Sequence, residues 1–160
     1  MMRFLPLLAL LGAAPAMDIT PAATCTLDQR ATEAAFRALP LVSTEDDTEA
    51  DETGTLFGFD PSAAALWGTR PSIVALTVYA NRTTGDVTQS FETRLAGDYN
   101  PARGALVAAH AKATCDRETG SAGSRRCELS LRSDGAWARS ATLAENGAGL
   151  TLACAFSKRG

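Results

Sequence analysis

Four cysteines behind a short apolar leader constrain the fold of this chain more than any other feature of its sequence. Residues 1–16 carry one early positive charge at Arg3, an apolar run over 4–11 and the small-residue pattern Ala14-Pro15-Ala16, so they predict a cleavable signal peptide. An exported chain folds where thiols become oxidised. We therefore expect its four cysteines to form two disulfides: Cys25, Cys115, Cys127 and Cys154.

The remaining residues, 17–160, are enough for one hydrophobic core and predict a single disulfide-stabilised globular domain. No later apolar run approaches the roughly 20 residues that a spanning helix needs, so we expect no membrane span. Arginine outnumbers lysine thirteen to two and alanine is abundant, which is typical of GC-rich bacterial coding. The sequence thus favours a bacterial protein that is periplasmic or secreted.

Charge excludes one class of partner. The formal net charge of −3 becomes −4 once a leader containing Arg3 is removed, and an acidic chain of this kind is not expected to bind nucleic acid. The charge is uneven, because residues 17–100 carry a net −8 and residues 101–160 a net +4. We expect the two halves to neutralise each other in the fold, although such an asymmetry also marks partner surfaces.

Helical spacing and capping patterns predict two main helices. The first covers residues 27–39 after a capping box at Thr26, and the second covers residues 102–115 after Asn100-Pro101. A brief helix is predicted between Asp60-Pro61 and Gly68, ending at Leu66-Trp67.

Acidic residues crowd residues 43–54, which we interpret as a solvated loop. A calcium site is the functional alternative, because Asp47, Glu49 and Asp51 are spaced like the first ligands of an EF-hand. That motif requires Gly at its sixth position and Glu at its twelfth, where this chain has Glu52 and Gly58. The loop interpretation is therefore preferred.

Alternation predicts the strands. Residues 56–59 form a short strand, and residues 72–80 pair with 87–95 as a hairpin whose first strand is apolar on both faces and so covered on both sides. Residues 127–132, 136–144 and 149–156 form a three-stranded meander, because Ser133-Asp134-Gly135 and Asn146-Gly147 are strong hairpin signals. An apolar face requires a bulge in the first turn and places Leu143 opposite Leu150.

This register limits the disulfides. It places Cys127 in one row with Ala141 and Leu152, two strands from Cys154, and two strand spacings of about 4.8 Å exceed the roughly 7 Å that a disulfide spans between Cα atoms. A Cys127–Cys154 bridge is thereby excluded and two connectivities remain. We favour Cys115–Cys127 with Cys25–Cys154, because the first pair closes the polar loop 116–126 and the second ties the N-terminal helix to the last strand.

No catalytic, cofactor-binding or metal-binding residue stands out. His110, the only histidine, lies beside the apolar side of its helix, and no nucleophile motif, phosphate loop or dinucleotide fingerprint accompanies it. Oxidised cysteines leave zinc without ligands. Three residues are candidate binding residues: Arg139, which the register places on the apolar face between Leu129 and Cys154, and the two tryptophans, Trp67 and Trp137.

The sequence therefore predicts an α+β fold, with an antiparallel sheet of five to six strands, a C-terminal meander and two main helices packed on the sheet. It favours a non-catalytic exported module that binds a protein or a small ligand. A small periplasmic hydrolase using paired carboxylates is the alternative, and a structural envelope accessory protein is the third. The oligomeric state and the identity of the partner do not follow from the sequence.

Overall fold

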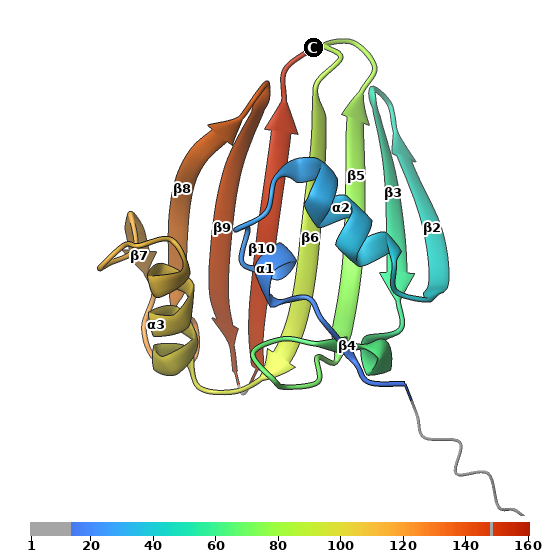
Figure 1. Cartoon of the computed structure of the whole chain (residues 1–160). Coiled ribbons are helices and arrows are strands. Elements are labelled where there is room, and N and C mark those ends of the chain that lie inside the picture. Colours follow the sequence, from blue (N-terminus) through green and yellow to red (C-terminus); the bar gives the residue numbers. More distant parts are fainter. Residues whose placement is uncertain (1–13, 148) are drawn as a thin grey trace, which may run out of the picture.

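The computed structural model describes residues 14–147 and 149–160, which form a mixed α+β fold built on one large antiparallel sheet (Figure 1). Its eight strands lie in the order β2-β3-β5-β6-β10-β9-β8-β7. Their bounds are β2 Leu41–Glu49, β3 Glu52–Phe59, β5 Ile73–Asn81, β6 Val87–Ala96, β7 Arg117–Thr119, β8 Arg126–Asp134, β9 Trp137–Asn146 and β10 Gly149–Lys158. The predicted signal peptide lies outside the described residues except for its last three positions.

The C-terminal meander β8-β9-β10 is present, with the predicted face but a different register. Leu143 pairs with Leu152 instead of Leu150, and Cys127 pairs with Leu143 instead of Ala141. Both shifts are of two residues, because Asn146 joins the ladder opposite Gly149 and a bulge falls between Leu131 and Asp134. An even shift keeps every side chain on its face, so the apolar face is the predicted one.

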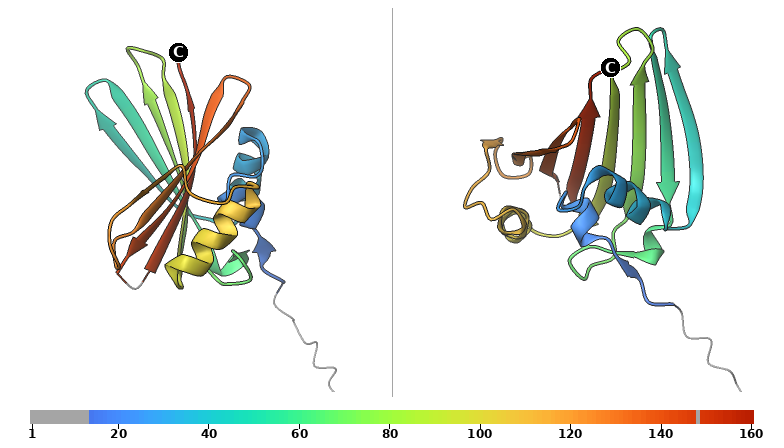
Figure 2. Two further views of the ribbon diagram at one scale, coloured as in Figure 1. Left: turned by 90° about the vertical axis from the view of Figure 1, so that its left-hand side faces the viewer. Right: turned by 45° about the horizontal axis from the view of Figure 1, so that its top comes forward.

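Three helices cover one face of the sheet: α1 Thr20–Ala23, α2 Gln29–Arg37 and α3 Tyr99–Ala109 (Figures 1 and 2). Helix α1 was not predicted. Helix α2 begins two residues later than expected, because the Asp28 side chain accepts from Ala31 N at 2.7 Å and caps it. Helix α3 starts earlier than predicted and ends at Ala109 with His110 as its C-cap, since Ala111 adopts a left-handed φ of 51°.

The core lies between these helices and the sheet. Phe36 of α2 contacts Phe59 and Phe91 edge to face at centroid distances of 6.4 and 5.0 Å, and Phe91 contacts Phe156 at 6.0 Å. The buried apolar residues form a single cluster that includes Cys25, Cys127 and Cys154. Disulfides join Cys25 to Cys154 and Cys115 to Cys127, the pairing that the sequence favours.

Two predicted local structures differ. The acidic segment 43–54 is not a loop; it forms most of β2 and the start of β3, paired from Ser43–Gly58 to Glu49–Glu52. The predicted helix before Gly68 is only a 3₁₀ turn, Pro61–Ala63, followed by strand β4, Ala64–Ala65, which pairs in parallel with β1, Met17–Asp18. Burial of Ile19 and Ala64 draws these short strands together.

The second face of the sheet has no helix on it among the described residues (Figure 2, left panel). Strand β5 is therefore covered on one face only: Val74 and Leu76 are buried, whereas Ile73 and Tyr79 are exposed on the other face. The expectation that β5 is covered on both sides was wrong: on the second face Ala75 is buried, but no described helix covers that face, and Ile73 and Tyr79 are open to solvent. None of the described helices is long and apolar enough to cross a membrane.

Candidate functional site

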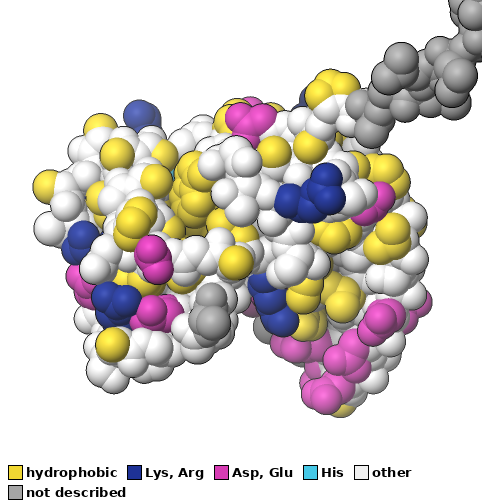
Figure 3. Space-filling view, turned by 90° about the horizontal axis from the view of Figure 1, so that it is seen from below, with side chains coloured by type: hydrophobic (Ala, Val, Ile, Leu, Met, Phe, Trp, Pro, Cys, Tyr) yellow, Lys and Arg dark blue, Asp and Glu magenta, His cyan; other side chains and the backbone are white. Residues whose placement is uncertain are grey.

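An apolar hollow of about 320 Å³ opens at the end of the molecule where α3 begins. We call it the Trp67 hollow. Its walls come from the turn after β4, the last residues of β6, the start of β10 and the first turns of α3. The lining residues are Trp67, Thr69, Leu95, Ala96, Gly97, Asp98, Pro101, Ala102, Ala105 and Leu150. Figure 3 views the molecule from this end, where apolar side chains gather between the α3 side and the centre. A concave apolar surface with few polar groups is typical of a small-molecule site.

Trp67 is held at this hollow by an unusual backbone conformation. Leu66 and Thr69 exchange backbone hydrogen bonds of 2.8 and 2.9 Å, and the two residues between them, Trp67 and Gly68, have φ angles of 50° and 73°. Two positive φ angles in succession define the type I′ turn, whose first central position favours Asn, Asp or Gly. Trp67 N donates to Thr20 Oγ1 at 2.8 Å, which fixes the turn against α1.

The other two candidate binding residues lie elsewhere. Trp137 opens β9 at the far end of the sheet, whereas Leu150 of the hollow lies opposite Glu145, near the other end of that strand. The structure therefore does not bring Trp67 and Trp137 into one site. Trp137 packs partly buried against the core.

Arg139 lies on the helix-covered face, opposite Leu131 and Phe156 instead of between Leu129 and Cys154. Its guanidinium does not pair with a carboxylate of the described chain. Nη1 donates to the backbone oxygen of Leu27 at 3.1 Å, and its buried Nε has no partner among the described atoms. The side chain thus fixes the segment between α1 and α2.

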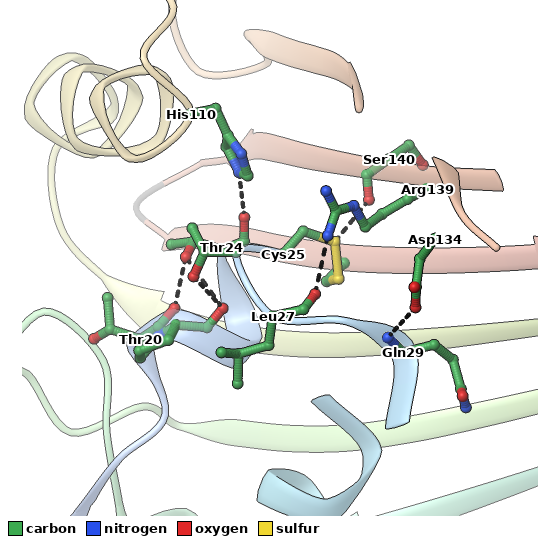
Figure 4. Close-up of a disulfide and its surroundings, with 12 residues drawn as sticks. Thr20, Thr24, Cys25, Leu27, Gln29, His110, Asp134, Arg139 and Ser140 are labelled. Carbon is green, nitrogen blue, oxygen red and sulfur yellow. Dashed lines mark hydrogen bonds between the residues drawn. A yellow bond between two sulfur atoms is a disulfide. The ribbon is translucent and has the colours of Figure 1, made fainter. Parts of the chain in front are cut away.

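His110 fixes the same segment from α3 (Figure 4). Its Nε2 lies 2.6 Å from the Thr24 backbone oxygen, to which a protonated Nε2 donates. Between the two contacts, Cys25 adopts a left-handed φ of 62° and is bonded to Cys154. Both His110 and Arg139 therefore support the backbone around the disulfide.

Five basic residues of the second half form ion pairs with acidic residues of the same half. Arg125 donates from Nε and Nη2 to the two oxygens of Glu145, each at 2.9 Å, and Arg126 pairs with Glu128 at 2.7 Å. The Arg125 hydrogen bonds lower the pKa of Glu145 from 4.5 to about 2, against a smaller opposing effect of desolvation. The sequence had suggested that the two halves neutralise each other, but every ion pair among the described residues joins two groups of the same half.

Six carboxylates of the β2–β3 hairpin remain without an ion pair in the described part of the chain: Glu45, Asp46, Asp47, Glu49, Asp51 and Glu52. Figure 3 shows a strip of acidic side chains at its lower right. A second hollow of about 330 Å³ lies beside the strip and is lined by Glu45, Asp46, Asp47, Gly54, Leu56, Thr77 and Tyr79. Within the described residues, no group of three or more His, Cys, Asp or Glu side chains is placed to hold a metal ion.

Sequence reasoning missed most of the Trp67 hollow. Leu95, Ala102 and Leu150 were assigned only to strands or a helix, and their meeting depends on how α3 packs against β6 and β10. One local signal was available, because Gly68 also fits the second central position of a tight turn over Leu66-Trp67-Gly68-Thr69. Comparison of the chain with family models, curated proteins and solved structures found no match, so its function is argued from this geometry.

Proposed function

We propose that the protein is a non-catalytic, exported module that binds a small, largely apolar ligand in the Trp67 hollow. The volume of the hollow suits a compact ring system or a short branched chain, and its apolar walls favour burial of such a group. Thr69 and Asp98 are the polar side chains of the lining, so a ligand with a hydrogen-bond donor at one end fits best.

The backbone of Trp67 is the observation that carries this proposal. A left-handed conformation costs a non-glycine residue on the order of 1 kcal/mol, and such strain clusters at ligand sites. Asparagine or glycine would make the same turn at lower cost. A large indole at this position gives the hollow an aromatic wall, which a purely structural turn does not need.

Export is supported by the predicted leader and by the two disulfides, which suit an oxidising compartment. Cleavage after Ala16 would leave the described core intact, since its first buried residue is Ile19. A periplasmic or secreted location is therefore part of the proposal.

The hydrolase alternative has less support. Glu45 and Asp47 line one hollow together, but both are exposed residues of an edge strand. General acid–base catalysis with two carboxylates requires surroundings that differ enough to separate their proton affinities. Glu45 and Asp47 instead share the same solvent-exposed surroundings on one strand.

The proposal is tested by plugging the hollow. Ala105→Phe places a ring in the Trp67 hollow from α3, whereas Ala108→Phe makes the same change at an exposed position of the same helix. We expect native mass spectrometry of protein purified from the periplasm to show a discrete bound small molecule in the wild type and in Ala108→Phe, and none in Ala105→Phe. Absence of any ligand from the wild type, or equal retention by both variants, would contradict the proposal.

A further inference from the structure

The two edges of the sheet differ in whether another strand has access to them. At one edge, strand β7 contains only three residues. Beyond β7, side chains already form hydrogen bonds with the outer backbone groups of β8: Ser130 N donates to Asp116 Oδ2 at 2.8 Å, and Lys112 Nζ donates to Ser130 O at 3.2 Å. At the other edge, β2 is nine residues long, exposed throughout, and paired only with β3. Strand β2 is thus the long open edge of the described sheet.

Exposed apolar side chains gather beside this open edge. The large apolar residues with the highest exposure in the described chain, between 36% and 63%, all belong to β2, β3 and β5: Leu41, Val42, Leu56, Ile73 and Tyr79. Long flat edges with nearby apolar surface are where a strand from another chain adds to a sheet. The open edge of the sheet and its exposed apolar side chains therefore lie together, at β2, β3 and β5.

The hollow beside β2 suits one long side chain. A Cβ atom at Gly54 would lie 2.9 Å from Tyr79 Cε1, so the Tyr79 ring lies directly over this glycine. Gly54 and Leu56 form the floor, and the carboxylates of Glu45 and Asp47 stand on the β2 side. A lysine or arginine that reaches across β2 would place its stem on apolar atoms and its charge between the carboxylates and the aromatic ring.

Charge selects the occupant of the edge. Glu45, Asp47 and Glu49 alternate along β2 and so project to the open face, with no ion-pair partner among the described residues. A second copy would bring the same negative charges opposite them and be repelled. A strand with basic residues at every second position would instead place its cations opposite the three carboxylates.

We propose that β2 is a docking edge for an extended, positively charged segment of a partner protein, which adds to the sheet as a further strand. Backbone hydrogen bonds along β2 hold the segment, and alternate lysines or arginines set its register against Glu45, Asp47 and Glu49. This surface lies apart from the Trp67 hollow, so the two proposals stand independently.

The test uses a parent heptapeptide of alternating threonine and lysine with blocked termini. It also uses two isomers with three backbone N-methyl groups each: in one isomer the methyl groups are on odd positions, and in the other they are on even positions. Binding to the purified, oxidised protein is measured by fluorescence anisotropy and located by hydrogen exchange at the β2 amides. We expect the parent peptide to bind, one isomer to bind about a hundredfold more weakly because three backbone hydrogen bonds are lost, and the other to bind nearly as well.

Matched variants test the charge. Asp47→Lys is expected to lower the affinity for the parent peptide by about tenfold, whereas Asp51→Lys, the same charge change in the turn between β2 and β3 and outside the lining of the hollow, has a smaller effect. Circular dichroism verifies that both variants fold. Absence of binding, equal binding of both methylated isomers, or equal effects of the two variants would overturn the proposal, as would wild-type dimers that pair through β2.

Discussion

Arg125 joins three segments that are distant in the sequence. Its guanidinium pairs with Glu145 of β9 through two hydrogen bonds, lies 4.6 Å from the ring centroid of Tyr99 at the start of α3, and donates to Asn100 Oδ1 at 3.1 Å. The flat fork of an arginine is suited to both contacts at once, whereas a lysine ammonium makes neither the paired hydrogen bonds nor the stacking. This side chain therefore positions one wall of the Trp67 hollow indirectly, through the start of α3.

The pair of Arg125 and Glu145 predicts a pH-dependent stability. Because folding lowers the pKa of Glu145 from 4.5 to about 2, the folded state favours the carboxylate, and this contribution is present above about pH 4.5 and lost as the pH falls toward 2. Urea unfolding should show Glu145→Gln to be less stable than the wild type at about pH 7, with a difference that shrinks as the pH approaches 2. Arg125→Gln should lose the same pH-dependent increment. A difference that is constant over this range would exclude the ion pair as its cause.

For single residues, the sequence predicted the face of the sheet on which a side chain lies better than it predicted the neighbours of that side chain on the adjacent strands. The alternation of side chains along a strand placed Arg139, Cys127 and Cys154 on the correct face of the sheet. The register of β9 is shifted by two residues from the predicted one, so Arg139 has different neighbours. The length of each turn sets this register, and the sequence does not show whether Asn146 belongs to the turn or to strand β9. Trp67 was named as a candidate binding residue and lies at the hollow, yet its turn was taken for a helix end because Gly68 fits both.

Among the elements that the sequence did not predict, strand β2 is the longest. An edge strand exposed on both faces buries little, so β2 has no apolar alternation to reveal it. Its strand conformation comes instead from the ladder with β3, in which Phe57 and Phe59 alternate with Gly58. The pairing with β3 makes this segment a strand, whereas the acidic composition of residues 43–54 indicated a loop.

Helix α2 is short and depends on tertiary packing. Its nine residues are too few to be stable alone, and Phe36 is the large side chain that it buries completely between β3 and β6. Phe36→Ala is expected to lower the free energy of unfolding by about 3–5 kcal/mol, through lost burial and the cavity that remains. Arg30→Ala, an exposed change on the same helix, should stay within about 0.5 kcal/mol in the same urea titration. Similar losses for both variants would show that the helix is not held by its aromatic contact.

The whole molecule is a sheet with one covered and one open face, and the covered face divides into two regions. Helices α1 and α2 pack across the central strands β5, β6 and β10, while α3 packs beside β9. The Trp67 hollow lies where these regions meet, at the ends of β6 and β10. The sequence predicted the sheet, the meander and two of the helices, because those depend on local patterns. It did not predict the hollow, because that arises from packing among three separate stretches of the chain, residues 67–69, 95–105 and 150.

The two disulfides act on very different lengths of chain, so they should contribute unequally to stability. Cys25–Cys154 closes a loop with a sequence separation of 129, against 12 for Cys115–Cys127. Loop-closure entropy predicts contributions of about 5 and about 3 kcal/mol at 25 °C. Replacing both members of a pair by alanine and measuring urea unfolding should therefore destabilise the first variant by about 2 kcal/mol more than the second. Alanine at position 25 retains the same left-handed backbone cost as cysteine, so that strain is common to the wild type and the variant. If the variant lacking Cys115–Cys127 were the less stable one, the bridge would act through its native contacts beside β8 instead of through the unfolded chain.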